Sequence, residues 1–236
     1  MNEGSARPFC SSDVLYYMIM RRLAFRSIFL VVVFCSSFAA HATPVADIVK
    51  KLQARYDSTD GFRADFTQEI ESATLGQKVE SRGTVVFKKP GRMRWEFGEP
   101  QQALVSDGKF FWLYQPAEKH VLKTPFQQAF SSSTPASFLL GVGHIEQDFT
   151  VSLTGETKET YQLRLTPKKD PEAIGVLDLA VSTKTFDILQ ATVTDPLGNT
   201  TRLRFANIDR TVPLDDALFH FTVPPGIDVI EALPSS

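Results

Sequence analysis

The sequence predicts a mainly β domain (α+β) built on one antiparallel sheet that is strongly curved or barrel-like. About ten or eleven short segments alternate apolar and polar residues, which is the period-two pattern of strands with one solvated face. Turn signals such as Asp107-Gly108 and Asp195-Pro196-Leu197-Gly198-Asn199 separate these segments at close spacing. Helical spacing is confined to two short stretches, and no shift in composition divides the chain after its N-terminal segment.

The first 42 residues have the plan of a secretory signal peptide. Three arginines precede an apolar run at residues 28–34, and Ala40-His41-Ala42 places small residues at positions −3 and −1. The run is shorter than the roughly 20 residues that a membrane-spanning helix needs, which disfavours an uncleaved anchor. Phe34 disfavours a lipid-modified Cys35. We therefore expect residues 1–42 to be an N-terminal extension with a cleaved signal, cut after Ala42, and residues 43–236 to form a single exported domain.

Composition excludes several classes of function. The net charge of −2 offers no basic surplus of the kind that nucleic-acid binding needs. Both cysteines, Cys10 and Cys35, precede the expected cleavage site, so the exported domain contains neither a disulfide nor a cysteine-ligated metal. The cell envelope, to which the protein is exported, contains neither ATP nor reduced nicotinamide. The remaining classes of function are therefore binding and hydrolysis.

The predicted elements follow in chain order. Pro44 suits the first position of a helix capped by Thr43, and an apolar stripe continues that helix through Val45, Ile48, Val49, Leu52 and Tyr56. Strands are predicted around residues 62–70, 84–88, 92–97, 103–106, 110–114, 150–153, 161–166, 176–182, 188–194, 201–207 and 219–223.

Residues 125–143 break the strand pattern with consecutive serines and threonines between apolar side chains. Pro135 is suited to open a short helix that Gly141 ends. From the pattern alone, the segment is either a plug of the core or a movable lid over an apolar cavity, with the plug favoured.

No catalytic motif is present. The chain lacks a G-x-S-x-G elbow, an H-E-x-x-H pair and a P-loop, and its histidines after residue 42 are far apart. We therefore predict no enzyme activity, no cofactor and no metal site. The concentrated basic residues are interpreted as solvated strand edges and turns: Arg82, Lys88, Lys89, Arg92 and Arg94.

Aromatic residues are concentrated in the first strands, and the chain has 19 phenylalanines. Such residues usually form the core. The concave face of one curved sheet must nevertheless be filled, and an apolar ligand completes the burial where helices cover it incompletely.

Five motifs in one order carry a family resemblance: GFRADFTQEI, KKPGRMRWEF, SDGKFFWLYQP, TPASFLL and FTVPPGIDVI. The chain resembles the LolA family of periplasmic outer-membrane lipoprotein carriers over residues 45–231. The resemblance implies an unclosed, strongly curved antiparallel β half-barrel that is covered by an α-helical lid, and it makes the lid the favoured reading of residues 125–143.

The resemblance also implies a function. Such a chain is a periplasmic chaperone that binds triacylated lipoproteins released by an inner-membrane ABC exporter (LolCDE-like) and delivers them to an outer-membrane receptor (LolB-like). We expect it to act as a monomer and to bind no nucleic acid. The alternative is a lipoprotein receptor or lipid-sensing domain of the same fold, LolB-like or RseB-like.

Site residues come from both sources. The resemblance places the lid helix at Phe138, Leu139 and Leu140 and cavity positions at Met93 and Trp95, while the pattern adds Phe66, Phe87, Leu104 and Trp112 to the acyl cavity. The resemblance places the family's latch arginine, which donates hydrogen bonds to lid carbonyls, at Lys89. Lysine keeps the charge but loses the planar fork of arginine, so Arg92 or Arg94 is the alternative latch.

Overall fold

The computed structural model describes residues 44–129, 144–169 and 175–231. The chain divides into two units, Met1–Ala42 and Thr43–Ser236, and all described residues belong to the second. Within the described residues, no helix is both long and apolar enough to cross a membrane.

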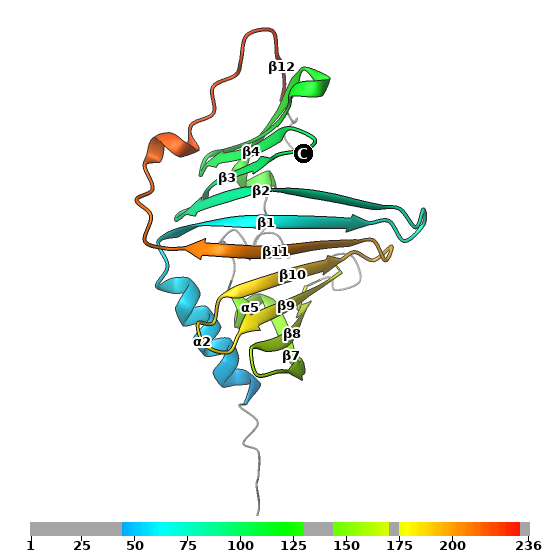
Figure 1. Ribbon diagram of the computed structural model, residues 1–236, viewed down its shortest axis with the longest axis vertical. Helices are drawn as coiled ribbons and strands as arrows, with labels where there is room; N and C mark the ends of the chain where they lie inside the picture. The colour runs from blue at the N-terminus through cyan, green and yellow to red at the C-terminus, as the bar shows by residue number, and fades with distance from the viewer. Residues whose placement is uncertain (1–43, 130–143, 170–174, 232–236) are drawn as a thin grey trace, which may run out of the picture. The chain divides into compact units, whose positions relative to one another are not determined.

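One sheet of twelve strands forms the domain (Figure 1). Its spatial order is β12-β6-β5-β4-β3-β2-β1-β11-β10-β9-β8-β7, and β7 and β12 do not pair with each other, so the sheet is unclosed. Ten of the strand pairs are antiparallel and one, β12 with β6, is parallel. The predicted fold class is confirmed. The strands are β1 (Gly61–Glu71), β2 (Lys78–Lys88), β3 (Arg92–Phe97), β4 (Gln102–Asp107), β5 (Phe110–Gln115), β6 (His120–Pro125), β7 (Phe149–Glu156), β8 (Thr160–Pro167), β9 (Val176–Ser182), β10 (Ile188–Thr194), β11 (Thr200–Asp209) and β12 (Asp228–Glu231).

Helix α2 (Val45–Asp57) covers one half of the sheet's inner face. It begins one residue later than predicted, because Pro44 is its N-cap residue rather than its first helical residue. Its buried residues Ile48, Val49 and Leu52 pack with strands β7 to β10 in one hydrophobic cluster. The other helical elements of the described residues are short: α3 (Phe126–Ala129), α5 (Ile145–Asp148), and the 3₁₀ turns η1 (Pro116–Glu118) and η2 (Asp216–Phe219).

Strand register defines the inner face on the other half of the sheet. Residues that pair directly across strands point to the same side, and one such row runs through Ala64, Val85, Trp95 and Leu104. These side chains build a second apolar part of the core with Phe66 and its neighbours. The inner face is therefore apolar on both halves, but only the β7–β10 half packs against α2 in the described residues.

The outer face of β2 to β5 is covered by the chain that follows β11. Figure 1 shows this segment in orange, running past β2, β3 and β4 towards β12. Phe219 is 1% exposed, and the Phe221 ring lies 6.2 Å from that of Trp112. We call residues 214–221 the strap. The strand predicted at residues 219–223 is therefore wrong: these alternating aromatic residues pack on the outer face. Phe219 ends η2, whose N-cap residue Asp215 accepts a hydrogen bond from the Ala217 N–H.

Basic side chains on the outer face hold the strap. Lys88 Nζ lies 2.5 Å from Asp216 Oδ1 and also binds the Leu214 carbonyl, and Arg92 Nη1 lies 3.5 Å from Asp216. Arg94 donates to the Leu218 carbonyl. The interpretation of most of the basic residues as solvated strand edges and turns is wrong for Lys88, Arg92 and Arg94, because β2 and β3 are interior strands whose outer face has a partner.

This ion cluster predicts acid release of the strap. The hydrogen bond from Lys88 and the charges of Arg92 and His220 lower the pKa of Asp216. A depressed pKa in the docked state stabilises docking above the ordinary carboxyl pKa of about 4 and loses that effect as the pH falls through the lower value. In a Trp95→Phe background, we expect Trp112 fluorescence to change as the pH falls below the ordinary carboxyl pKa of about 4. Asp216→Asn should remove this transition and Asp228→Asn should retain it; a transition unaffected by Asp216→Asn would contradict the assignment.

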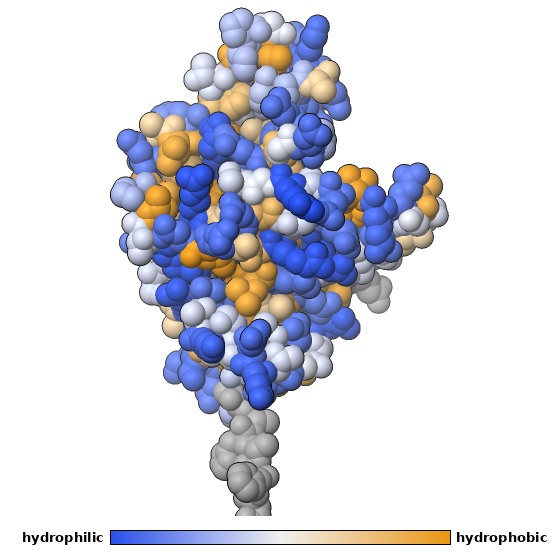
Figure 2. Space-filling model, viewed as in Figure 1, coloured by the Kyte–Doolittle hydropathy of each residue, from blue (hydrophilic) through white to orange (hydrophobic). Residues whose placement is uncertain are grey.

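Exposed apolar side chains gather where the β1–β2 and β10–β11 connections meet. Ala73 N–H donates to the Asn199 side chain there, at 3.0 Å. Figure 2 shows hydrophobic surface on the projecting arm that β1 and β2 form in this view. The exposed residues at this end of the strands are Ile70, Leu75, Val79 and Leu197.

Candidate functional site

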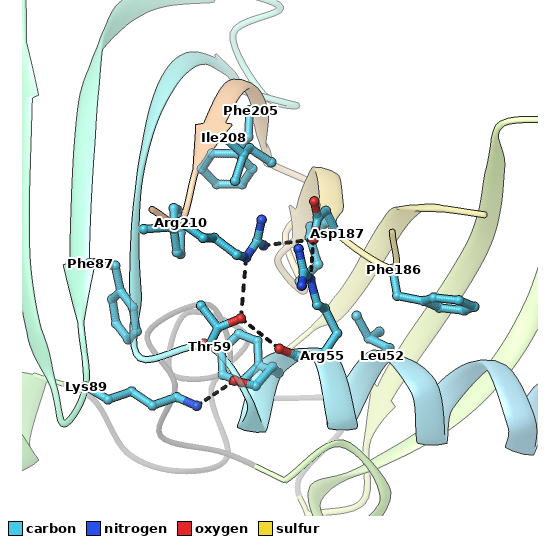
Figure 3. A pocket seen from close by; sticks show the side chains of 13 residues that line it. Leu52, Arg55, Thr59, Phe87, Lys89, Phe186, Asp187, Phe205, Ile208 and Arg210 are labelled. Carbon is cyan, nitrogen blue, oxygen red and sulfur yellow. Dashed lines mark hydrogen bonds and ion pairs between the residues drawn. The ribbon is translucent and has the colours of Figure 1, made fainter. Parts of the chain in front are cut away.

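A cavity of about 50 Å³ lies between the C-terminal half of α2 and the inner face of the sheet (Figure 3). It forms where the two parts of the hydrophobic core meet. Leu52 and Ile188 belong to the α2 part, whereas Phe62 and Phe205 belong to the part built on β1 to β4. The cavity is lined by Leu52, Arg55, Tyr56, Thr59, Phe62, Phe87, Lys89, Phe186, Asp187, Ile188, Phe205, Ile208 and Arg210.

A polar network borders this apolar cavity. Asp187 Oδ1 binds two guanidinium groups at once, with Arg55 Nε at 2.8 Å and Arg210 Nη2 at 2.9 Å. Thr59 Oγ1 donates to the Arg55 carbonyl at 2.8 Å and accepts from Arg210 Nε at 3.4 Å. The Arg210 guanidinium also lies 5.7 Å from the centre of the Phe62 ring. These contacts connect the last turns of α2 to the β9–β10 turn and to the end of β11.

Burial lowers the pKa of Arg210, the charge of Asp187 opposes this shift, and the neighbouring Arg55 adds to it. Arginine nevertheless stays protonated in proteins because its ordinary pKa is so high. The network therefore holds two positive charges against one carboxylate in a half-buried position.

Lys89 binds the C-terminal end of α2. Its Nζ donates to the Tyr56 carbonyl at 2.5 Å and to the Asp57 carbonyl at 3.2 Å, and it lies 5.2 Å from the centre of the Tyr56 ring. A cation at the C-terminus of a helix satisfies terminal carbonyls and opposes the negative end of the helix dipole. Within the described residues, the predicted latch thus binds helix α2. The lid segment to which the resemblance assigned its bonds lies outside these residues.

Five of the predicted cavity residues lie on the inner face. Phe87 lines the cavity itself. The Phe66 ring packs against Trp95 at 4.8 Å between ring centres, and Leu104 pairs with Trp95 across β3 and β4. Met93 is 2% exposed and pairs with Phe87. Phe66, Met93, Trp95 and Leu104 form an apolar floor beside the cavity but do not line it.

The sequence pattern assigned Trp112 to the acyl cavity, but in the structure this residue lies on the outer face. It pairs with Val105 and Lys123, which point to the outer face, and its ring lies against Phe110 and Phe221. All six residues of β5 are half-buried because the strap covers one face and the core the other. Trp112 therefore contributes to strap packing and does not face the cavity.

The predicted lid residues Phe138, Leu139 and Leu140 lie outside the described residues. Of the residues that line the cavity, the sequence predicted only Phe87 and Lys89 as site residues. The ion network of Arg55, Asp187 and Arg210 was not predicted. These three residues are distant in the sequence and meet only through the fold. Only the helical position of Arg55, one turn after Lys51, gave any local signal, and it did not indicate which side chain it would contact.

The donor set does not suit a metal ion. Within the described part of the chain, no three His, Cys, Asp or Glu side chains come together as metal ligands. The polar atoms at the cavity are mostly donors of positively charged groups, and these attract anions rather than cations. The arrangement can bind an apolar group and an anion, but it contains no nucleophile paired with a base.

The model of one protein family, described as "Outer membrane lipoprotein carrier protein LolA", matches residues 57–222. The chain belongs to the LolA family. This LolA-family chain is 31% identical over 209 residues to an outer-membrane lipoprotein carrier protein of Methylococcus capsulatus, covering 88% of this chain and 98% of the relative. It is 32% identical over 186 residues to a carrier protein of the same description from Nitrosomonas europaea, covering 78% and 89%.

Solved structures support the fold of this LolA-family chain. An uncharacterized conserved protein from Thermus thermophilus superposes with a TM-score of 0.51 at 14% identity, over 80% of this chain and 99% of that one. At this identity the match shows the architecture alone.

Proposed function

We propose that this chain is a periplasmic carrier that binds the acyl chains of triacylated lipoproteins released from the inner membrane and delivers them to an outer-membrane receptor. Its relatives are named as outer-membrane lipoprotein carriers. The observation that carries the proposal is the apolar inner face, whose two core parts are separated by a cavity beneath α2. The cargo's acyl chains would lie on the floor formed by Phe66, Phe87, Met93, Trp95 and Leu104.

The size of the cavity indicates that loading requires movement. The cavity of about 50 Å³ is far smaller than the roughly 300–1,000 Å³ of a usual ligand pocket. We therefore expect this cavity to take a whole acyl chain only when α2 moves away from the inner face. Burial stabilises by about 0.8 kcal/mol per CH₂, so one sixteen-carbon chain fully enclosed would gain roughly 12 kcal/mol. Three such chains would exceed the strongest non-covalent affinities, so we expect partial burial, which also permits release to a receptor.

The route of the cargo follows from the same proposal. An export signal cleaved after Ala42 would place residues 43–236 in the periplasm. An inner-membrane ABC exporter of the LolCDE type would load the carrier, and a receptor of the LolB type would unload it. Acyl chains and protein contacts suffice for both transfers, so the carrier needs no cofactor and catalyses no covalent step.

A release assay tests this function. The chain is expressed in full in a Gram-negative host, purified from the periplasmic extract, and added to spheroplasts depleted of their own carrier. We expect lipoproteins to leave the membrane in a soluble complex with the added protein. Absence of release by folded protein with a matched exporter would reject the carrier and favour a receptor or lipid sensor of the same fold.

A pair of neighbouring substitutions assigns the release activity to the inner face. Leu104 and Ala103 are adjacent, half-buried residues of β4 that point to opposite faces. Leu104→Asn places an amide on the apolar floor, and we expect it to reduce lipoprotein release at least about tenfold, which corresponds to about 1.4 kcal/mol. Ala103→Asn should release as the unchanged protein does, with circular dichroism confirming that both variants fold. Equal release by the two variants would remove the floor from the site.

Lys89→Leu should impair delivery rather than binding. The substitution removes the two bonds that hold the end of α2 to the β2–β3 turn, while the apolar floor stays intact. We expect cargo release from spheroplasts to persist and transfer to receptor-containing outer membranes to fall several-fold. Lys109→Leu, at an exposed hairpin position, is the control and should transfer normally. Normal transfer by Lys89→Leu would show that this residue is not the latch.

A further inference from the structure

The cations at the cavity have no role in the proposed binding of acyl chains. In a triacylated lipoprotein the terminal amine is acylated and the sulfur carries a diacylglyceryl group, so the lipid end of the cargo has no charge. The cavity lining nevertheless includes the cations Arg55, Lys89 and Arg210 with only one acidic residue, Asp187. The lining therefore has an excess of two positive charges.

The positive charges are half-buried and incompletely compensated. The side chains of Asp187, Arg210 and Arg55 are 12%, 22% and 37% exposed. Both arginines bind the same oxygen of Asp187, which brings two like charges together. Within the described residues, neither the Nη groups of Arg55 nor Nη1 of Arg210 makes a hydrogen bond. An anionic oxygen at this place would accept those donors and reduce the repulsion between the guanidiniums.

The walls around these donors are apolar. Leu52 lies on the α2 side, and Phe87 and Phe205 lie on the sheet side (Figure 3). Phe62, a residue of β1, also lines the cavity. Phe62 and Phe205 also pack in the same apolar cluster as Trp95, which belongs to the apolar floor. A ligand that satisfies both parts of the site must combine an anionic head with an apolar chain, since a free anion leaves the walls uncovered and a neutral chain leaves the donors unpaired.

We propose that this cavity binds an amphiphile with an anionic head group, a carboxylate or a phosphate, placed on Arg55 and Arg210 with its chain between Leu52 and Phe62. Because the cavity is small, α2 must move to admit the chain, which then extends from the cavity along the inner face. This ligand class differs from the uncharged acyl end of a lipoprotein, and the inference does not depend on the carrier function.

Calorimetric titration with matched probes tests the proposal. The protein is expressed in full, purified from the periplasmic extract and freed of lipid. It is titrated with dodecanoate, with dodecanol as the neutral probe of equal chain length, and with acetate and inorganic phosphate as anions without a chain. We expect dodecanoate to bind at least about tenfold more tightly than dodecanol and the two short anions to show no binding. Equal affinity for dodecanol, or binding of acetate or phosphate as tight as that of dodecanoate, would overturn the proposal.

Substitutions of the two arginines test where the anionic head group binds. Arg210→Met and Arg55→Met should each abolish the preference for dodecanoate over dodecanol, and Arg210→Lys should retain most of it. Arg164→Met is the matched control, because Arg164 is also paired with an aspartate, Asp178. The Arg164 side chain is 52% exposed and lies on the outer side of β8. Loss of the preference in Arg164→Met as well would show only a general charge effect and would overturn the site.

Two features keep the test decisive. If Arg210→Met lowers the melting temperature too far for titration, Arg55→Met leaves the pair between Arg210 and Asp187 in place and carries the comparison alone. The titrations contain no lipoprotein, so equal affinity for the two probes would leave the release assay untouched. Conversely, failure to release lipoproteins would leave the preference for an anionic head measurable.

Discussion

Gly83→Ala is expected to destabilise the domain by about 3 kcal/mol, at the upper end for an overpacked core. A Cβ atom at this position would lie 1.8 Å from the Glu96 carbonyl oxygen and 2.9 Å from Phe66 Cε1. Strand β2 cannot shift to make room, because it pairs with β1 on one side and β3 on the other. Gly83 pairs directly with Phe66 and Phe97, and its missing side chain lets their rings meet edge to face at 4.9 Å.

Thermal unfolding followed by circular dichroism measures this effect. For a domain of this size we expect the melting temperature to fall by roughly 6 to 12 °C. Gly98→Ala is the control, since the nearest atom to its added Cβ is 3.6 Å away, and it should change the melting temperature little. A similar melting temperature for Gly83→Ala and the unchanged protein would mean that the inner face is looser than the structure describes.

Asp187→Asn is expected to give the second large effect. It removes the carboxylate that two guanidinium groups share and leaves both charges half-buried beside the cavity. Breaking a fully buried ion pair costs about 3–5 kcal/mol; because Arg55 is 37% exposed, solvent screens part of this, and we expect about 2 kcal/mol. The same change should tighten dodecanoate binding, because the site loses its internal anion.

The control for this variant is Asp178→Asn, which breaks the exposed pair with Arg164. It should cost less than about 1 kcal/mol, as exposed pairs do, and leave dodecanoate binding unchanged. Urea unfolding measures both costs. Equal destabilisation by the two substitutions, or weaker dodecanoate binding in Asp187→Asn, would contradict the arrangement around the cavity.

Alternation predicted the strands well where one face of the sheet is wet. The bounds of β9 and β10 agree with the predicted ranges 176–182 and 188–194. It failed where both faces are covered. In β5 apolar residues occupy both faces, so alternation could not assign Trp112 to a side, and Phe219 and Phe221 alternate as a strand would while packing through the strap.

The cavity could be predicted only in outline. Aromatic residues on alternating positions indicated an apolar interior. The inner face does carry five of the predicted side chains, Phe66, Phe87, Met93, Trp95 and Leu104, but only Phe87 lines the cavity. The ion network was not predictable, because Arg55 and Asp187 are separated by 132 residues and their contact depends on how α2 crosses the sheet. The partner of Lys89 was equally hidden: a lysine before a proline gives no indication of which carbonyls it reaches.

Among the described residues, the unclosed sheet leaves β12 and β7 each with one unpaired side, and each is poorly suited to accept a strand from another molecule. Strand β12 has only four residues, begins and ends with the acids Asp228 and Glu231, and is exposed throughout. Strand β7 has an irregular register between Leu153 and Gly155. Short, charged and bulged edges discourage pairing between copies. Both edges of the open sheet therefore disfavour edge-to-edge association of copies of this chain.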